Sequence, residues 1–191
     1  TIIDNGWRLM NDSLDLIAHL RGATQKSLSI VPALYFYSEE ARNVRSLLYG
    51  FIFWLLAGQE QEIRHRKRIF AAHRAAFEQV LIQKKEDIVT GITRKTGSGP
   101  EVTVQTAQFF DGLLRLLIRH NDEIGSTEFL SDYSIMISTL TTVRESPGAD
   151  NTNQARRFFS EKQKSSLILN KLLQGLTHCG ICNGLLDATE A

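Results

Sequence analysis

The stretch SLLYGFIFWLLAG, from Ser46 to Gly58, decides the fold of this chain. It is the longest apolar run in the sequence, yet it is shorter than the roughly 20 residues that a membrane-spanning helix needs. Arg45 precedes the run, and the polar residues 59–62 follow it directly. A short helix that is apolar on every side belongs in a protein core. The run therefore predicts a central helix, buried on all sides, around which the other helices of a domain pack.

The composition indicates one globular domain outside the membrane. The chain has 191 residues, of which 42% are hydrophobic, enough for the core of a single domain with a small appendage. Its 22 lysines and arginines balance 21 aspartates and glutamates, so no overall field attracts a polyanion. Only two cysteines occur, and the first residues lack the basic and apolar regions of a signal peptide. We therefore expect a cytoplasmic protein with no membrane partner.

Two segments precede the central run. In the first segment, apolar residues recur at helical spacing: Trp7, Met10, Leu14, Ile17 and Ala18. This spacing predicts an amphipathic helix over residues 4–20. In the second segment, Leu28 to Ser38, Pro32 and the aromatic residues 35–37 favour a short extended or docking segment. Ser38, which two glutamates follow, is expected to cap the central helix.

The residues after the central run continue the helical pattern. Residues 60–95 contain no proline and predict one long helix, whose core-facing stripe is Ile63, Phe70, Phe77, Val80, Leu81, Ile88 and Ile92. The sequence TGSGP, residues 96–100, marks a turn. Two further helices are expected over residues 102–121 and 127–140. The second of these is expected to bury Phe129, Tyr133, Ile135, Met136 and Leu140.

The composition changes toward the end of the chain. Residues 144–154 hold no large apolar side chain and open a predicted linker over 144–157. Residues 160–175 predict a capped helix that stops at Gly175. We therefore expect an all-α helical bundle over residues 1–143, with a short extended segment near 28–38. After the linker, residues 158–191 would hold a helix and an incomplete zinc-knuckle tail.

Cys179 and Cys182 form a C-x-x-C pair near the end of the sequence. In zinc knuckles, two thiolates at this spacing bind one tetrahedral zinc ion, but a structural site needs four ligands. His178 adjoins Cys179 and is poorly placed to join the same site, so the other ligands have to come from elsewhere. The same spacing serves thioredoxin-type redox enzymes, where the pair begins a helix that follows a strand. We expect half of a structural zinc site, with a redox pair or two unlinked thiols as alternatives.

Basic residues gather in the run EIRHRKRIFAAHR, residues 62–74. The candidates for contact with nucleic-acid phosphates are Arg64, Arg66, Lys67, Arg68 and Arg74. Helical spacing places Arg64 near Lys67 and Arg68 on one face. Such a stripe predicts salt-dependent binding to double-stranded DNA. The alternative is an ordinary solvated helix face, neutralised in part by neighbouring glutamates.

Two other patterns were considered as sites of chemistry. Residues 94–100, RKTGSGP, place cations before a glycine-rich turn, but the spacing does not fit a P-loop, and an interhelical loop is expected. Five carboxylates could pair for acid–base work: Asp111, Asp122, Glu123, Glu128 and Asp132. Nothing in their spacing requires such pairing, and solvated carboxylates are expected. We assign no catalytic residue from the sequence.

Three stretches of the chain resemble a bacterial protein family. They are VPALYFYS (31–38), DIVTGITRKTGSGP (87–100) and FFSEKQKSSLILNKLLQGLTHCGICNGLLD (158–187). Proteins of this family carry an N-terminal ParB-like domain with a DGQQR-type motif, then a helical domain, then an HNH nuclease module. The family is linked with restriction of foreign DNA. The resemblance covers most of the chain, and its most specific part is the helix followed by C-x-x-C.

The resemblance implies a helical connecting and DNA-engaging domain of a metal-dependent HNH endonuclease, in which Cys179 and Cys182 begin the nuclease zinc site. The sequence contains no DGQQR-like segment, no second C-x-x-C and no HNH histidine and asparagine set. We therefore expect a fragment that is itself non-catalytic and lacks the divalent metal of its parent nuclease. Its expected partners are double-stranded DNA, the missing ParB-like and HNH segments, and a second copy in a homodimer.

The alternative function is a structural or protein-interaction module without DNA contact. Its helices would mediate dimerisation or docking to a ParB-like domain, with Trp7, Tyr35 and Tyr37 as exposed aromatic anchors. Affinity for DNA falls steeply with salt, whereas apolar docking is nearly indifferent to salt. A salt series therefore separates the two functions.

Overall fold

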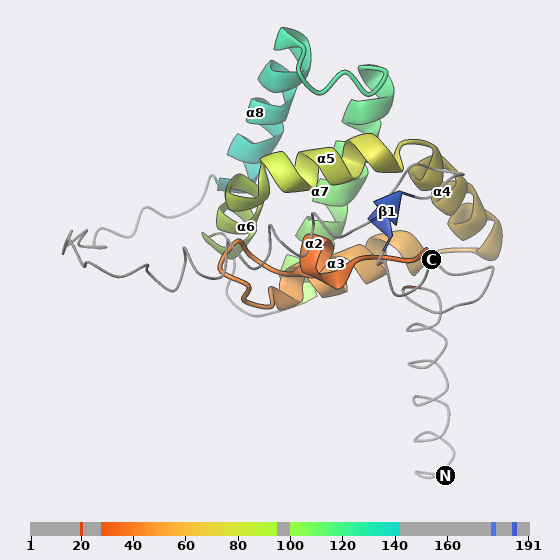
Figure 1. Cartoon of the computed structure of the whole chain (residues 1–191). Helices are drawn as coiled ribbons and strands as arrows, with labels where there is room; N and C mark the ends of the chain where they lie inside the picture. Colours follow the sequence, from red (N-terminus) through yellow and green to blue (C-terminus); the bar gives the residue numbers. More distant parts are fainter. Residues whose placement is uncertain (1–19, 21–27, 95–99, 142–176, 179–184, 187–191) are drawn as a thin grey trace.

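The computed structural model describes Leu20, residues 28–94 and 100–141, and the strand residues 177–178 and 185–186. The long segments of this described part are mainly helical (Figure 1), which confirms the predicted all-α bundle. In chain order the helices are α2 (Pro32–Phe36), α3 (Arg45–Leu56), α4 (Glu60–Ala72), α5 (Arg74–Gln83), α6 (Lys85–Arg94), α7 (Pro100–Arg119) and α8 (Thr127–Thr141). The predicted helices over 4–20 and 160–175 and the linker over 144–157 lie outside the described residues, apart from Leu20.

The segment before the central run is helical, so the predicted extended conformation near 28–38 is wrong for residues 32–36. Pro32 lies in the first turn of α2, where its missing N–H costs no intrahelical hydrogen bond. Val31 is the N-cap, and α2 buries Tyr35 and Phe36. The prediction that Ser38 caps the central helix is wrong, because the N-cap of α3 is Val44. The Oγ of Ser38 accepts hydrogen bonds from the backbone N–H groups of residues 40 and 42, within the turn that precedes α3.

The central helix α3 lies at the lower edge of the described helices in Figure 1 and makes its most extensive contact with α7. Gly50 permits this contact, because a Cβ there would lie 2.4 Å from the side chain of Thr106. Phe51 and Leu55 are fully buried, but Tyr49 and Phe53 are 55% and 48% exposed. The prediction that this helix is buried on all sides is therefore wrong. Within the described part of the chain, no helix is both long enough and apolar enough to cross a bilayer.

The long helix predicted over residues 60–95 is three helices, α4, α5 and α6. The breaks occur at His73 and Lys84, where ψ is 11° and 20° instead of a helical value. Each break turns the chain so that consecutive helices present their apolar stripes to one core. Phe70 of α4, Phe77 of α5 and Ile88 of α6 are each fully buried there. The predicted stripe is confirmed from Phe70 to Ile92, whereas Ile63 is only half-buried, and the periodicity gave no sign of the breaks.

Aromatic rings form the centre of this core. The rings of Tyr35, Phe51, Phe70 and Phe77 meet in edge-to-face and stacked pairs, and the Phe51 and Phe110 centroids lie 5.4 Å apart at 89°. Each such pair contributes about 0.5–1.5 kcal/mol beyond the area it buries. These ring contacts join five helices, because the five rings belong to α2, α3, α4, α5 and α7.

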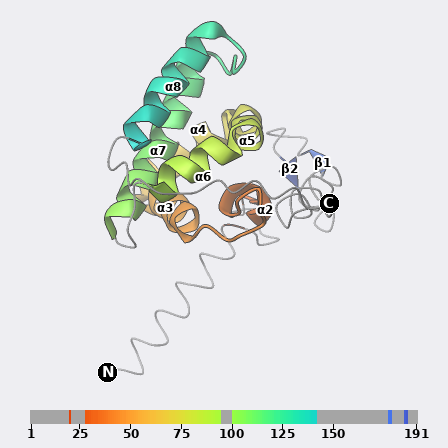
Figure 2. The same cartoon turned by 90° about the vertical axis from the view of Figure 1, so that its left-hand side faces the viewer.

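Helices α7 and α8 pack against each other; one end of α7 lies beside α3, and the corner that joins α7 to α8 lies away from α2 and α3 (Figure 2). Phe129 and Tyr133 of α8 are buried, as the sequence predicted. Ile135 is 60% exposed, so its predicted burial is wrong. The reason is its position on the helix, because it lies two residues from Tyr133 and therefore on another face.

Two short strands lie close to the C-terminal end of the sequence. β1 (Thr177–His178) pairs antiparallel with β2 (Leu185–Leu186), so that His178 lies opposite Leu185. His178 and Leu185 flank the stretch 179–184 in the sequence. Cys179 and Cys182 belong to that stretch and lie outside the described residues.

Candidate nucleic-acid interface

The basic helix α4 begins at a tight turn after α3. Gly58 adopts φ 114°, in the left-handed region that favours glycine, and a Cβ there would lie 2.5 Å from Glu62 Oε2. Glu62 Oε2 in turn accepts a hydrogen bond from the backbone N–H of Gln59 at 3.1 Å. Glu60 and Glu62 both lie in the first turn of α4, where negative charge suits the helix dipole. Gly58 and the two glutamates thus fix where α4 begins, and the basic residues of α4 follow the first turn.

Three basic side chains lie on the exposed face of α4. Arg64, His65 and Arg68 are exposed, and their spacing of three and four residues places them on one side of the helix. Arg64 pairs with Glu60, which raises the pKa of its guanidinium. Arg68 Nη2 lies 3.3 Å from His65 Nδ1. This face therefore presents hydrogen-bond donors to solvent, and Glu60, which pairs with Arg64, lies at the N-terminal end of the helix.

The other two predicted residues of α4 lie differently. Arg66 Nη1 donates a hydrogen bond to the Ala57 carbonyl at 2.9 Å, so this side chain closes the joint between α3 and α4. Lys67 is half-buried, next to the exposed face. The structure therefore brings Arg64, Lys67 and Arg68 together, and it assigns Arg66 to the C-terminal end of α3.

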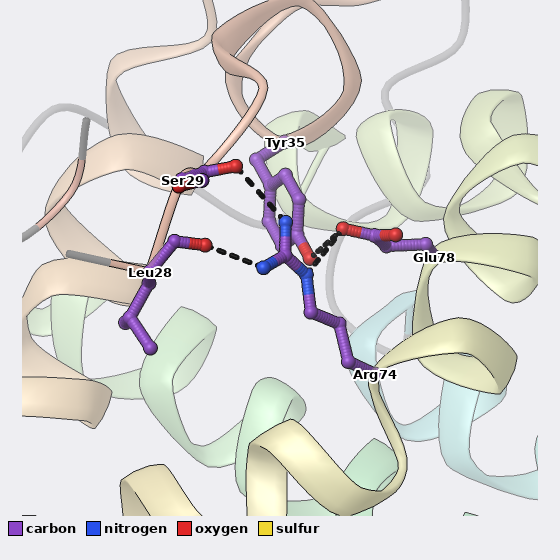
Figure 3. A network of polar contacts seen from close by, with 5 residues as sticks. All are labelled: Leu28, Ser29, Tyr35, Arg74 and Glu78. Atoms are coloured by element: carbon purple, nitrogen blue, oxygen red, sulfur yellow. Dashed lines mark hydrogen bonds and ion pairs between the residues drawn. The ribbon is translucent and has the colours of Figure 1, made fainter. Parts of the chain in front are cut away.

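Arg74 does not belong to the surface, which corrects its prediction as a phosphate contact. It is the first residue of α5, beyond the break at His73, and only 4% of its side chain is exposed. Arg74 Nε donates to Glu78 Oε1 at 2.7 Å, and its two Nη atoms donate to the carbonyls of Leu28 and Ser29 (Figure 3). A guanidinium held in this way cannot reach a phosphate.

The network around Arg74 attaches the segment before α2 to α5. The Tyr35 hydroxyl donates to Glu78 Oε1 at 2.8 Å, so that carboxylate accepts from both Tyr35 and Arg74 (Figure 3). Burial and the neighbouring carboxylate raise the pKa of Tyr35, which therefore keeps its proton. Ser29 adopts φ 45°, and the guanidinium holds its carbonyl at 3.0 Å. The network is structural, because Arg74 and Glu78 are buried and the hydrogen bonds described here join them to other residues of the same domain.

Three of the five candidate acid–base carboxylates lie beside basic side chains. Asp111 pairs with Arg115 at 2.7 Å, and Asp122 lies 3.0 Å from His73. Asp132 lies 3.1 Å from His120, and the hydrogen bond from His120 lowers the pKa of this carboxyl. Glu123 and Glu128 are exposed. The Asp122 pair links the α4–α5 break to the α7–α8 corner, the Asp132 pair links the end of α7 to α8, and the Asp111 pair lies within α7.

The remaining predicted residues are placed as follows. Tyr35, predicted as an exposed docking anchor, is fully buried, and this prediction is wrong. Tyr37 is half-buried, and Trp7 lies outside the described residues. The residues of the turn 95–99 also lie outside them. In the described part, no group of three or more His, Cys, Asp or Glu side chains is arranged to hold a metal ion.

Sequence reasoning missed one member of the exposed face and included two residues that do not belong to it, Arg66 and Arg74. His65 lies between Arg64 and Arg68 on the surface, and its four-residue spacing from Gln61 and three-residue spacing from Arg68 carried that signal. Arg74 carried the opposite signal. It lies three residues before Phe77 and seven before Leu81, on the buried stripe of α5.

Comparisons of the chain with protein-family models, with curated proteins and with solved structures found no match.

Proposed function

We propose that this chain is a helical DNA-engaging domain that contacts the phosphate backbone of duplex DNA through the exposed face of α4. The observation that carries the proposal is the gathering of Arg64, His65 and Arg68 on one exposed face, with Lys67 beside them. Cations on a helix face contact phosphates without reading bases, so the proposed binding is salt-dependent and not sequence-specific. The resemblance of the sequence to HNH-type restriction endonucleases supports DNA as the partner.

The test is duplex-DNA binding by the full chain across a salt series. Replacing Arg64, Lys67 and Arg68 together with Ala is expected to weaken binding strongly. Each lost phosphate contact lowers the slope of log K against log salt by about 0.9, so the triple variant should lose about 2–3 from that slope. These side chains are exposed or half-buried, so the melting temperature should change little.

Arg115→Ala is the matched control for this experiment. Arg115 is an exposed arginine of α7 that pairs with Asp111 at i,i+4, as Arg64 pairs with Glu60 on α4. The control should keep both the affinity and the salt slope. If the triple variant binds DNA as the unaltered chain does, α4 is a solvated helix face and the proposal is wrong.

We propose further that Cys179 and Cys182 supply two thiolate ligands to a structural zinc ion. The support is the chemistry of the donors and the pairing of His178 with Leu185, the two residues that flank the stretch 179–184 in the sequence. The other two ligands come from outside this pair. When bound, zinc would supply folding free energy to this part of the chain, and no catalytic step is assigned to it.

Metal analysis of the purified chain tests the zinc proposal. We expect bound zinc in the unaltered chain and its loss in Cys179→Ser and in Cys182→Ser, because each variant removes one of the two thiolates. His178→Ala is the control and should keep zinc, because a side chain directly next to Cys179 in the sequence is poorly placed to bind the same ion. Zinc retained by both cysteine variants would contradict the assignment, and fast alkylation of the thiols at neutral pH would favour the redox alternative.

The second candidate function is a protein-interaction module without DNA contact. Tyr49 and Phe53 on α3 favour it, because large exposed aromatic side chains one helical turn apart are typical of interaction hot spots. This function predicts binding to a partner protein that salt barely weakens. The salt series on α4 therefore separates the two candidates.

A further inference from the structure

The outer face of α3 is apolar and exposed. Tyr49 and Phe53 are 55% and 48% exposed, and Ile52 and Leu56 on the same side are half-buried. The opposite side of the helix packs on α7 and α2. Two exposed aromatic side chains with two aliphatic neighbours form a patch that water solvates poorly, so a covering group would stabilise it.

The sequence supplies an apolar stripe of matching kind before α2. Large apolar residues recur at helical spacing in the first 19 residues: Trp7, Met10, Leu14 and Ile17. An amphipathic helix of this length is marginal in water by itself and gains its stability by burying its apolar side. The apolar stripe of the segment and the apolar face of α3 would therefore each be stabilised by burial against the other.

The point of attachment keeps this segment close to α3. Leu20 is 9% exposed, belongs to the main core, and accepts a hydrogen bond from Ile30 N at 2.7 Å. Ile30 comes directly before the N-cap of α2, and α2 packs on α3. Nineteen helical residues span about 28 Å, whereas the 12 residues of α3 span about 18 Å. The segment is thus attached next to a helix that packs on α3, and a helix of its length would be long enough to cover the face.

The charges of the two surfaces are complementary. The segment carries Asp4, Asp12 and Asp15 against a single arginine, Arg8. Arg45 is exposed at the first position of α3, four residues before Tyr49 and on the same side. A cation at a helix N-terminus opposes the helix dipole, so an acidic neighbour would offset that unfavourable contact. We propose that residues 4–19 dock on the outer face of α3 and cover Tyr49 and Phe53. This inference does not depend on DNA binding by α4.

Acrylamide quenching of tryptophan fluorescence tests this docking in the full chain. The sequence has two tryptophans, and Trp54 is only 5% exposed, so a change in quenching reports on Trp7. In the unaltered chain Trp7 should be shielded. Tyr49→Asp and Phe53→Asp should each raise the quenching constant severalfold. Ile135→Asp, at an exposed residue of α8, should leave it unchanged.

Substitutions on the segment itself provide a second measurement that leaves α3 intact. Met10→Asp and Ile17→Asp should raise the quenching of Trp7 as the α3 variants do, and combining both sides should add little further. Trp7 freely quenched in the unaltered chain overturns the proposal. So does shielding that survives both α3 variants, which would assign the face to another segment. A halving of the sedimentation mass by Tyr49→Asp without a change in Trp7 would instead assign it to a second copy.

Discussion

Replacing Arg74 with Met is expected to lower the free energy of unfolding by about 3–5 kcal/mol, because it leaves the carboxylate of Glu78 buried without its cation. Glu78 is 2% exposed, and Arg74 also holds the carbonyls of Leu28 and Ser29. Urea unfolding followed by circular dichroism measures the change. Arg68→Met is the matched control, since the same substitution at an exposed arginine should cost less than about 0.5 kcal/mol.

The combined variant Arg74→Met/Glu78→Met should recover part of this loss. Removing both members of a buried ion pair takes away the uncompensated charge, and such replacements are often close to neutral. The Leu28 and Ser29 carbonyls still lose a donor, so the recovery should be incomplete. A loss below about 1 kcal/mol for Arg74→Met alone would contradict the structural role of Arg74. The DNA affinity of the folded Arg74→Met chain should not change, whereas Arg68→Met should weaken it.

The sequence was sufficient to predict the helical class and most of the core. Apolar residues at helical spacing identified Phe70, Phe77 and Ile88 as buried, because the apolar stripe of a helix faces the core. The same periodicity does not reveal a single residue whose backbone angles leave the helical range. The breaks at His73 and Lys84 carry no proline or glycine, so three helices were predicted as one. Pro32 and the aromatic residues after it favoured an extended segment, although proline is well tolerated in the first turn of a helix, where Pro32 lies.

The candidate site was predictable only in part, because charge patterns do not reveal which cations are buried. Arg74 and Arg68 stand in one basic run, yet one is buried against Glu78 and the other is exposed. The difference depends on the break at His73, which starts a new helix whose buried stripe includes Arg74. The carbonyls that satisfy Arg74 belong to residues 28 and 29, more than 40 positions away in the sequence, and no local pattern indicates such a contact.

Between about pH 8 and pH 9.5 the chain should become more stable as the pH rises, because of Lys85. This side chain is 4% exposed, and its Nζ donates to the Leu34 carbonyl, which joins α6 to α2. Burial lowers the pKa of Lys85 to about 7, although the charge of Glu39 opposes the shift. The unfolded chain holds this proton up to about pH 10.4, so in this window it binds more protons than the folded chain. One such proton raises the free energy of unfolding by about 1.4 kcal/mol per pH unit.

Lys85→Met should remove this slope, because methionine fills a similar volume and carries no proton to lose. The neighbouring Lys84 is half-buried, with its Nζ 6.0 Å from the centre of the Tyr133 ring, and Lys84→Met should keep the slope. Above about pH 10 the trend should reverse in every variant. Burial raises the pKa values of Tyr35 and Tyr133, so the unfolded chain loses those protons first. Urea unfolding at fixed pH values measures these slopes. A stability that is flat from pH 8 to 9.5 in the unaltered chain, or a slope that survives Lys85→Met, would show that Lys85 is not buried as a neutral amine.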